Sequence, residues 1–100
     1  MARFDLIAVY ILANRKNGTL YVGVTSDLIT RMGDHKDGHG SRFTAKYRTF
    51  RLVYYQRYPE MQPALQREAR LKEWRRRWKI DLIEAINPHW LDLSGALSPY

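Results

Sequence analysis

The sequence predicts one α+β domain, a three-stranded sheet flanked by about three helices in the order β-β-α-β-α-α. Three observations lead to this prediction. Short β-rich runs alternate with longer stretches of helical periodicity. A chain of 100 residues, with 45% hydrophobic residues and 13% aromatics, has the length and the apolar content of one packed domain. Repeats, long linkers and low-complexity stretches are absent, so a single domain is expected over residues 1–100.

The first two strands are expected to form a hairpin. Residues 6–13 are a short apolar run, rich in Val, Tyr and Ile, and this favours a buried strand over a helix of the same length. Asn17-Gly18 tolerates positive φ and therefore favours a turn. Residues 19–24 then resume a β-rich run.

A helix is expected next, because residues 25–27 each offer an N-cap. Its apolar stripe is formed by Leu28, Ile29 and Met32. Arg31 and His35 share a different face, at positions i and i+4. Residues 38–49 are polar and punctuated by glycine, which predicts an exposed loop.

One more strand and two more helices complete the prediction. The strand is expected at about residues 50–57, before Pro59. Pro63 fits the first turn of a helix whose apolar spacing continues to Trp74, with Glu68 in its middle. A last helix is expected to stop before Asn87-Pro88, since a residue that precedes proline is disfavoured in the α region.

Charge is concentrated in two blocks of a chain whose net charge is +7. Residues 31–58 hold seven basic and two acidic groups, and residues 67–79 hold the same numbers. Clustered cations favour a polyanion, because each phosphate that is neutralised releases condensed counterions. The alternative is a solvated helix face. Aromatic residues lie among these cations and could stack on bases.

Several kinds of site are excluded or disfavoured by composition and spacing. The chain has no cysteine, which excludes disulfides, thiolate zinc sites and cysteine nucleophiles. Gly33 and Gly38 have the gap of a phosphate loop, but the Lys-Ser/Thr that should follow is missing. The longest apolar run, residues 6–13, is far shorter than the roughly 20 residues of a membrane span. We therefore expect a cytoplasmic protein without a membrane segment.

The remaining polar residues suit the hydrolysis of a phosphodiester, which needs an attacking water, charge stabilisation on the phosphate and help for the leaving oxygen. Arginine supplies permanent charge, a carboxylate can hold Mg²⁺, and Tyr or His can relay a proton. The chain offers Tyr10, Tyr21, Arg31, His35 and Glu68. The structural alternative is equally open: strand tyrosines, a surface cation, and an acid paired with Lys72 at i+4.

The order and spacing of these residues form a recognisable pattern. Val9-Tyr10-Ile11 is followed, after nine residues, by Tyr21-Val22-Gly23, and then by Leu28, Arg31 and His35. This pattern resembles the GIY-YIG nuclease superfamily, in particular its small stand-alone bacterial branch, with Val9 and Val22 in place of a motif glycine and isoleucine. The resemblance covers about residues 6–93 and implies a small GIY-YIG-like fold.

The resemblance also implies roles for the motif residues. Tyr10 and Tyr21 would line the active site. Tyr21 is the expected general base, with a positioning role as the alternative, because an unperturbed tyrosine has a pKa near 10. Arg31 would contact the scissile phosphate. Glu68 would be the one carboxylate that binds the metal, which is Mg²⁺ with Mn²⁺ as a substitute.

Two further residues are assigned from the resemblance. His35 lies where relatives carry a group for proton transfer or phosphate binding. Asn87 lies where some relatives have an active-site asparagine, and a helix stop before Pro88 is the alternative. The cations expected to bind nucleic acid are Lys36, Arg42, Lys46, Lys72, Arg75 and Arg76.

The function implied by the resemblance is that of a Mg²⁺-dependent DNA endonuclease with low sequence specificity. A catalytic domain that fills 100 residues leaves no room for a separate recognition domain. Selection by DNA structure is then expected, with branched, flapped or single-stranded DNA as substrates, a protein partner as a further option, and repair or recombination as the context. The alternatives are a non-catalytic nucleic-acid-binding module that uses the basic helix and a protein-interaction module built on the tryptophans.

Overall fold

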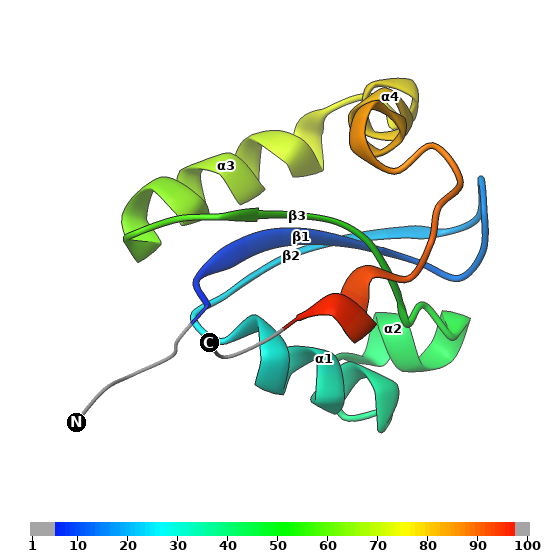
Figure 1. Cartoon of the computed structure of the whole chain (residues 1–100), viewed down its shortest axis with the longest axis horizontal. Helices are drawn as coiled ribbons and strands as arrows, with labels where there is room; N and C mark the ends of the chain where they lie inside the picture. Colours follow the sequence, from blue (N-terminus) through cyan, green and yellow to red (C-terminus); the bar gives the residue numbers. More distant parts are fainter. Residues whose placement is uncertain (1–5, 98–100) are drawn as a thin grey trace.

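A three-stranded antiparallel sheet lies between two layers of helices in the computed structural model, which describes residues 6–97 (Figure 1). Its elements in chain order are β1 (Ala8–Ala13), β2 (Leu20–Thr25), α1 (Leu28–Lys36), α2 (Arg42–Tyr47), β3 (Arg51–Arg57), α3 (Met61–Glu73), α4 (Arg76–Ile86) and the 3-10 helix η1 (Leu93–Ala96). The predicted α+β class and the order β-β-α-β-α-α are confirmed, with α2 and η1 as additions. Residues 1–5 and 98–100 of the predicted domain lie outside the described part.

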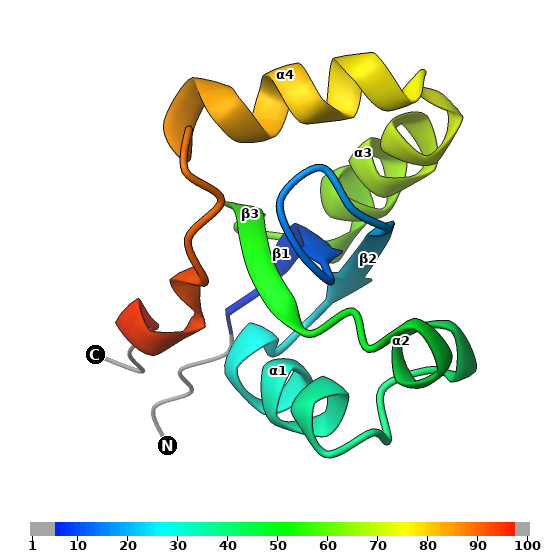
Figure 2. The same cartoon turned by 90° about the vertical axis from the view of Figure 1, so that its right-hand side faces the viewer.

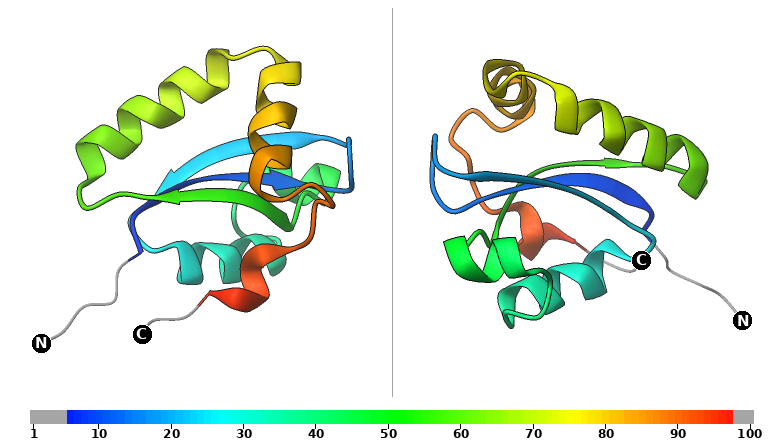
Figure 3. Two further views of the ribbon diagram at one scale, coloured as in Figure 1. Left: turned by 45° about the horizontal axis from the view of Figure 1, so that its top comes forward. Right: turned by 180° about the vertical axis from the view of Figure 1, so that it is seen from behind.

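The sheet has the strand order β2-β1-β3, so β1 is central. Helices α3 and α4 cover one face, whereas α1, α2 and η1 cover the other (Figures 2 and 3). Every residue of β1 is buried, which explains why this strand is a continuous apolar run instead of an alternating one. None of the described helices combines the length and the apolar character needed to cross a membrane.

Successive residues of β1 point into two different cores, as the strand period of two requires. Val9 and Ile11 belong to the core under α3 and α4, together with Leu71 and Ile83. The alternate residues of β1, including Tyr10, belong to a core against α1. The face of Tyr10 is therefore the face on which α1 lies.

Helix α2 corrects the predicted exposed loop. Ser41 caps the helix by accepting a hydrogen bond from the Thr44 amide at 3.0 Å, and Thr44 itself is fully buried. Six residues do not form a stable helix from propensity alone, so the cap and the tertiary contact of Thr44 hold this segment. The contact of Thr44 comes from His35 in α1 and could not be read from the polar sequence.

The end of α3 also differs from the prediction that was based on the apolar periodicity. Trp74 ends α3 with an extended backbone, where the apolar spacing predicted that it would continue the helix. The end of α4 is as predicted: Ile86 is its last residue and Asn87 its C-cap. α4 therefore crosses the sheet as a separate helix.

Candidate active site

Two tyrosines share the sheet face that lies against α1. Tyr10 in β1 is paired with Gly23 in β2, and Tyr21 lies two residues before that glycine, so all three are on one face. A Cβ on Gly23 would lie 2.5 Å from Cζ of Tyr10. The Tyr10 ring therefore crosses β2 over Gly23 and comes to rest with its centroid 6.3 Å from that of Tyr21.

Arg31 projects from α1 toward these tyrosines. Its Nη2 donates a hydrogen bond to the Gly40 carbonyl at 2.6 Å. Contact with the Tyr10 hydroxyl raises the pKa of Arg31, so the guanidinium is charged at any physiological pH. Burial raises the pKa of Tyr10 to about 12 although Arg31 opposes the shift, and the Tyr10 hydroxyl therefore stays protonated. The pair presents a fixed cation and a hydrogen-bond donor side by side.

His35 lies behind Tyr10 and is fully buried. Its Nε2 is 2.9 Å from the Tyr10 hydroxyl, and its Nδ1 is 3.0 Å from Oγ1 of Thr44. Burial, and then the charge of Arg31, lower the pKa of His35 to about 4. The neutral ring therefore donates one hydrogen bond and accepts the other, and it links Tyr10 in β1 to α2.

Glu68, the expected metal ligand, lies on α3. Its side chain is only 18% exposed, and its Oε2 lies 3.1 Å from Nζ of Lys72, which is 54% exposed. The negative charge of Glu68 makes the smallest of the contributions to the raised pKa of Tyr10. Over residues 6–97 there is no group of three or more His, Asp or Glu side chains that could hold a metal, so Glu68 is a lone acidic donor.

The residues of this site lie within a segment that matches the model of a known domain family. The model of the family described as GIY-YIG catalytic domain matches residues 6–81, more than three quarters of the chain and the whole of the cluster around Tyr10. The chain belongs to the GIY-YIG family. This is a family of endonucleases, and the substrate that it implies is DNA.

Relatives of this GIY-YIG protein are small chains. A UPF0213 protein of Bacillus pumilus is 37% identical over 70 residues, which are 70% of this chain and 71% of the relative. A UPF0213 protein of Staphylococcus aureus is 36% identical over 76 residues, 76% of this chain and 92% of the relative. The solution structure of a UPF0213 protein of Bacillus halodurans has 33% identity and a TM-score of 0.52, and covers 81% of this chain and 85% of its own.

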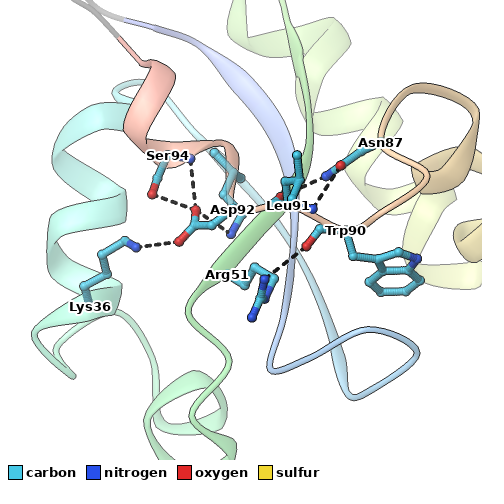
Figure 4. A network of polar contacts seen from close by, with 8 residues as sticks. Lys36, Arg51, Asn87, Trp90, Leu91, Asp92 and Ser94 are labelled. Carbon is cyan, nitrogen blue, oxygen red and sulfur yellow. Dashed lines mark hydrogen bonds and ion pairs between the residues drawn. The ribbon is translucent and has the colours of Figure 1, made fainter.

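Asn87 lies apart from this cluster, at the end of α4 on the other side of the sheet. Its Nδ2 donates to the carbonyls of Val53 and Leu91 at 3.0 and 2.9 Å, and its Oδ1 accepts from the Leu91 amide (Figure 4). These bonds occupy both amide hydrogens. They are the contacts of the helix-stop alternative, and they fix the turn after α4 against β3; the catalytic assignment of Asn87 has no contact in its favour.

The six cations expected to bind DNA are divided between the two helix layers. Lys36, Arg42 and Lys46 belong to α1 and α2, whereas Lys72, Arg75 and Arg76 belong to the α3 and α4 side. Arg76 donates to the carbonyls of Asn17 and Gly18 and so holds the β1–β2 turn. Arg76 is therefore engaged within the fold, and the assignment of the six cations to DNA binding stays a prediction.

The residues that the sequence analysis overlooked lie in the segment taken for a loop. The Gly40 carbonyl orients Arg31, and Thr44 holds His35. Gly40 has no room for a side chain, because a Cβ there would overlap the His35 ring. Phe43 lies with its ring 5.9 Å from that of Tyr21. The one available signal was Ser41, a favourable N-cap three residues before Thr44.

Stability is expected to fall on acidification through His35. An unfolded chain protonates this histidine near pH 6.5, whereas the folded protein does so only near pH 4, so protons favour unfolding between these values. The free energy of unfolding should decrease there by at most about 1.4 kcal/mol per pH unit. Urea unfolding between about pH 7 and pH 5 measures this. The change of the unfolding free energy with pH should be smaller in His35→Gln and unchanged in His39→Gln. An equal pH dependence in the wild-type protein and both variants would contradict the role of His35.

Proposed function

We propose that this GIY-YIG protein is a cytoplasmic, Mg²⁺-dependent DNA endonuclease of low sequence specificity that acts in repair or recombination. The observation that carries the proposal is that Tyr10 and Tyr21 share the sheet face covered by α1, that Arg31 of α1 contacts Tyr10, and that the charge of Glu68 in α3 acts on Tyr10. Cation, hydroxyl and carboxylate are the groups that phosphodiester hydrolysis requires.

The geometry suggests a division of labour among these side chains. Arg31, oriented by the Gly40 carbonyl, would stabilise the charge that develops on the phosphate oxygens. With His35 as the Nε2–H tautomer, the Tyr10 oxygen would accept from His35, and the single hydroxyl hydrogen of Tyr10 would be donated to the same oxygens and position the phosphate. Tyr21 faces this pair and would accept the proton of the attacking water or orient that water.

The lone carboxylate suits the proposed metal. Mg²⁺ is bound in proteins through one or two carboxylates, with water and substrate phosphate completing its shell, so Glu68 alone fits that ion. Glu68 is partly buried and has Lys72 as its one partner within residues 6–97, which leaves oxygen lone pairs for a cation. Mg²⁺, or Mn²⁺ in its place, would supply additional positive charge for the phosphate.

The surroundings of the site favour unpaired DNA. Phe43 and Tyr47 are 40% and 43% exposed, and their ring centroids are 4.9 Å apart, in a row that begins at Tyr21. Nζ of Lys46 lies 5.2 Å from the centroid of the Tyr47 ring. Exposed aromatic rings beside cations bind single strands by stacking, with little sequence preference. We therefore propose single-stranded or flapped DNA as the preferred substrate.

The decisive experiment offers end-labelled single-stranded, duplex, nicked, flapped and branched DNA to the purified protein, with Mg²⁺, Mn²⁺ or EDTA. Cleavage with either ion and none in EDTA is expected, with single-stranded and flapped DNA cut fastest. Salt-sensitive binding without cleavage of any DNA would indicate the non-catalytic binding module instead. Absence of both would rule out the nucleic-acid assignment.

Phe43→Ala combined with Tyr47→Ala should raise KM for single-stranded or flapped DNA by about tenfold and leave kcat within a few-fold, since one stacked base is worth about 1–3 kcal/mol. Trp78→Ala is the matched control, because this tryptophan is half exposed on α4, on the opposite side of the sheet. An unchanged KM in the double variant would refute the stacking surface.

A further inference from the structure

A second polar site lies beside α1, away from the tyrosines. It is a cavity of about 350 Å³ lined by Asn14, Lys36, Arg48, Phe50, Arg51 and Asp92. Lys36 follows Arg31 by five residues, which turns it about 140° around the helix and moves it about 7.5 Å along the axis. The cavity is therefore separate from the cluster around Tyr10, although both include α1.

The charge of this cavity is positive. Three cations face one carboxylate, and that carboxylate is already engaged: Oδ1 of Asp92 accepts from the Leu52 amide at 3.3 Å and from the amide and hydroxyl of Ser94, and Oδ2 accepts from Lys36 at 2.8 Å (Figure 4). Burial raises the pKa of Asp92, but hydrogen bonds from Lys36 and Ser94 lower it to about 2. Asp92 thus orients Lys36 at the cavity while a net charge of 3 − 1 = +2 remains.

The two arginines of the cavity keep donors available. Nη1 of Arg51 donates to the Trp90 carbonyl at 3.2 Å, which fixes the guanidinium while its other N–H groups are left for a ligand. Arg48 ends α2 with a left-handed backbone, φ 53° and ψ 48°, and no hydrogen bond or ion pair of its side chain occurs within the described residues. Glycine or asparagine is the usual residue in this conformation, so an arginine there points to a use of its side chain.

We propose that this cavity binds a backbone phosphate of the DNA, at a distance from the phosphate that is cleaved. Two planar guanidinium groups and an oriented ammonium are the donors that hold a phosphate monoanion. The choice of DNA as the source of the phosphate rests on the proposed function. The cavity would then hold the register of the strand while Arg31 acts on the scissile bond.

Arg48→Asn tests the proposal, because asparagine tolerates the left-handed backbone and carries no charge. Affinity for a labelled single-stranded oligonucleotide is measured by fluorescence anisotropy in EDTA at several salt concentrations. We expect a roughly three- to tenfold higher Kd at low salt, and a salt slope reduced by about 0.7, the value of one lost phosphate contact on a single strand. In the double variant Arg48→Asn with Lys36→Gln, the salt slope should be reduced by about twice that amount relative to the wild-type protein.

Arg57→Asn is the matched control, since Arg57 is an exposed arginine at the opposite end of β3 from Arg51. It should leave the salt slope unchanged, and thermal unfolding checks that both variants fold. Equal slopes in Arg48→Asn and Arg57→Asn, or no affinity of the wild-type protein for DNA, would overturn the cavity site. DNA binding that depends on Arg48 without cleavage would overturn the nuclease and leave the cavity site standing. Cleavage by the wild-type protein with no effect of Arg48→Asn on DNA binding would overturn the cavity site and leave the nuclease standing.

Discussion

Arg31→Ala is expected to lower kcat for DNA cleavage by about a thousandfold, the usual effect of removing an arginine that stabilises charge on a transferring phosphoryl group. The structure gives the reason: the guanidinium is held between the Gly40 carbonyl and the Tyr10 hydroxyl. Arg31→Lys should lose about a hundredfold, because one ammonium cannot replace a planar fork that makes both contacts. Single-turnover cleavage of a labelled flapped substrate measures both losses.

The control for these variants is Arg57→Ala, which removes the same charge from an exposed position at the end of β3. Its kcat should stay within about twofold of the wild-type value. If Arg31→Ala and Arg57→Ala had the same kcat, Arg31 would be the surface cation of the structural alternative. Thermal unfolding separates a lost contact from a lost fold, since Arg31 is only partly buried.

Glu68→Gln is expected to abolish Mg²⁺-dependent cleavage, a loss of at least about a thousandfold, while DNA binding in EDTA is retained. Glutamine keeps the size of the side chain but removes the charged oxygen that a hard cation requires. The same assay in Mn²⁺ should show the same loss. Glu73→Gln, an exposed acid near the end of the same helix, should cleave like the wild-type protein.

Lys72→Ala separates the two readings of Glu68. If Glu68 serves only as the i+4 partner of Lys72, removal of either residue should have the same small effect on stability and on kcat, since a pair with an exposed lysine contributes at most about 1 kcal/mol. If Glu68 holds the metal, Lys72→Ala should leave kcat within a few-fold while Glu68→Gln eliminates cleavage. Equal activity of the two variants would contradict the metal site.

The strands and the tyrosine face could be predicted from the sequence because they depend on local patterns. The apolar run before Ala13 and the spacing of Tyr10 from Tyr21 fix a hairpin whose register places both rings on one face. The fold class follows from the same patterns. Arg31 and His35 followed from helical spacing, since residues four apart share a face.

The contacts between the side chains of the site depend on tertiary structure and could not be predicted from the sequence. Helix α2 exists because Thr44 bonds to His35, and a bond between residues on two elements leaves no periodicity in the sequence. Asn87 shows the opposite case. Its motif position suggested chemistry, but its amide is committed to Val53 and Leu91, contacts that only the path of the chain after α4 reveals. The cation-lined cavity at Arg48 likewise joins residues from four separate segments.

The central position of β1 constrains how this protein could change over time. Because alternate residues of the strand enter opposite cores, a one-residue insertion or deletion within it would send Tyr10 into the α3 and α4 core and Ile11 into the site. Strand slippage would thus destroy both cores together with the active site. Changes within β1 that abolish activity but keep the fold must therefore be substitutions, and the spacing of this strand would be preserved after the chemistry is lost.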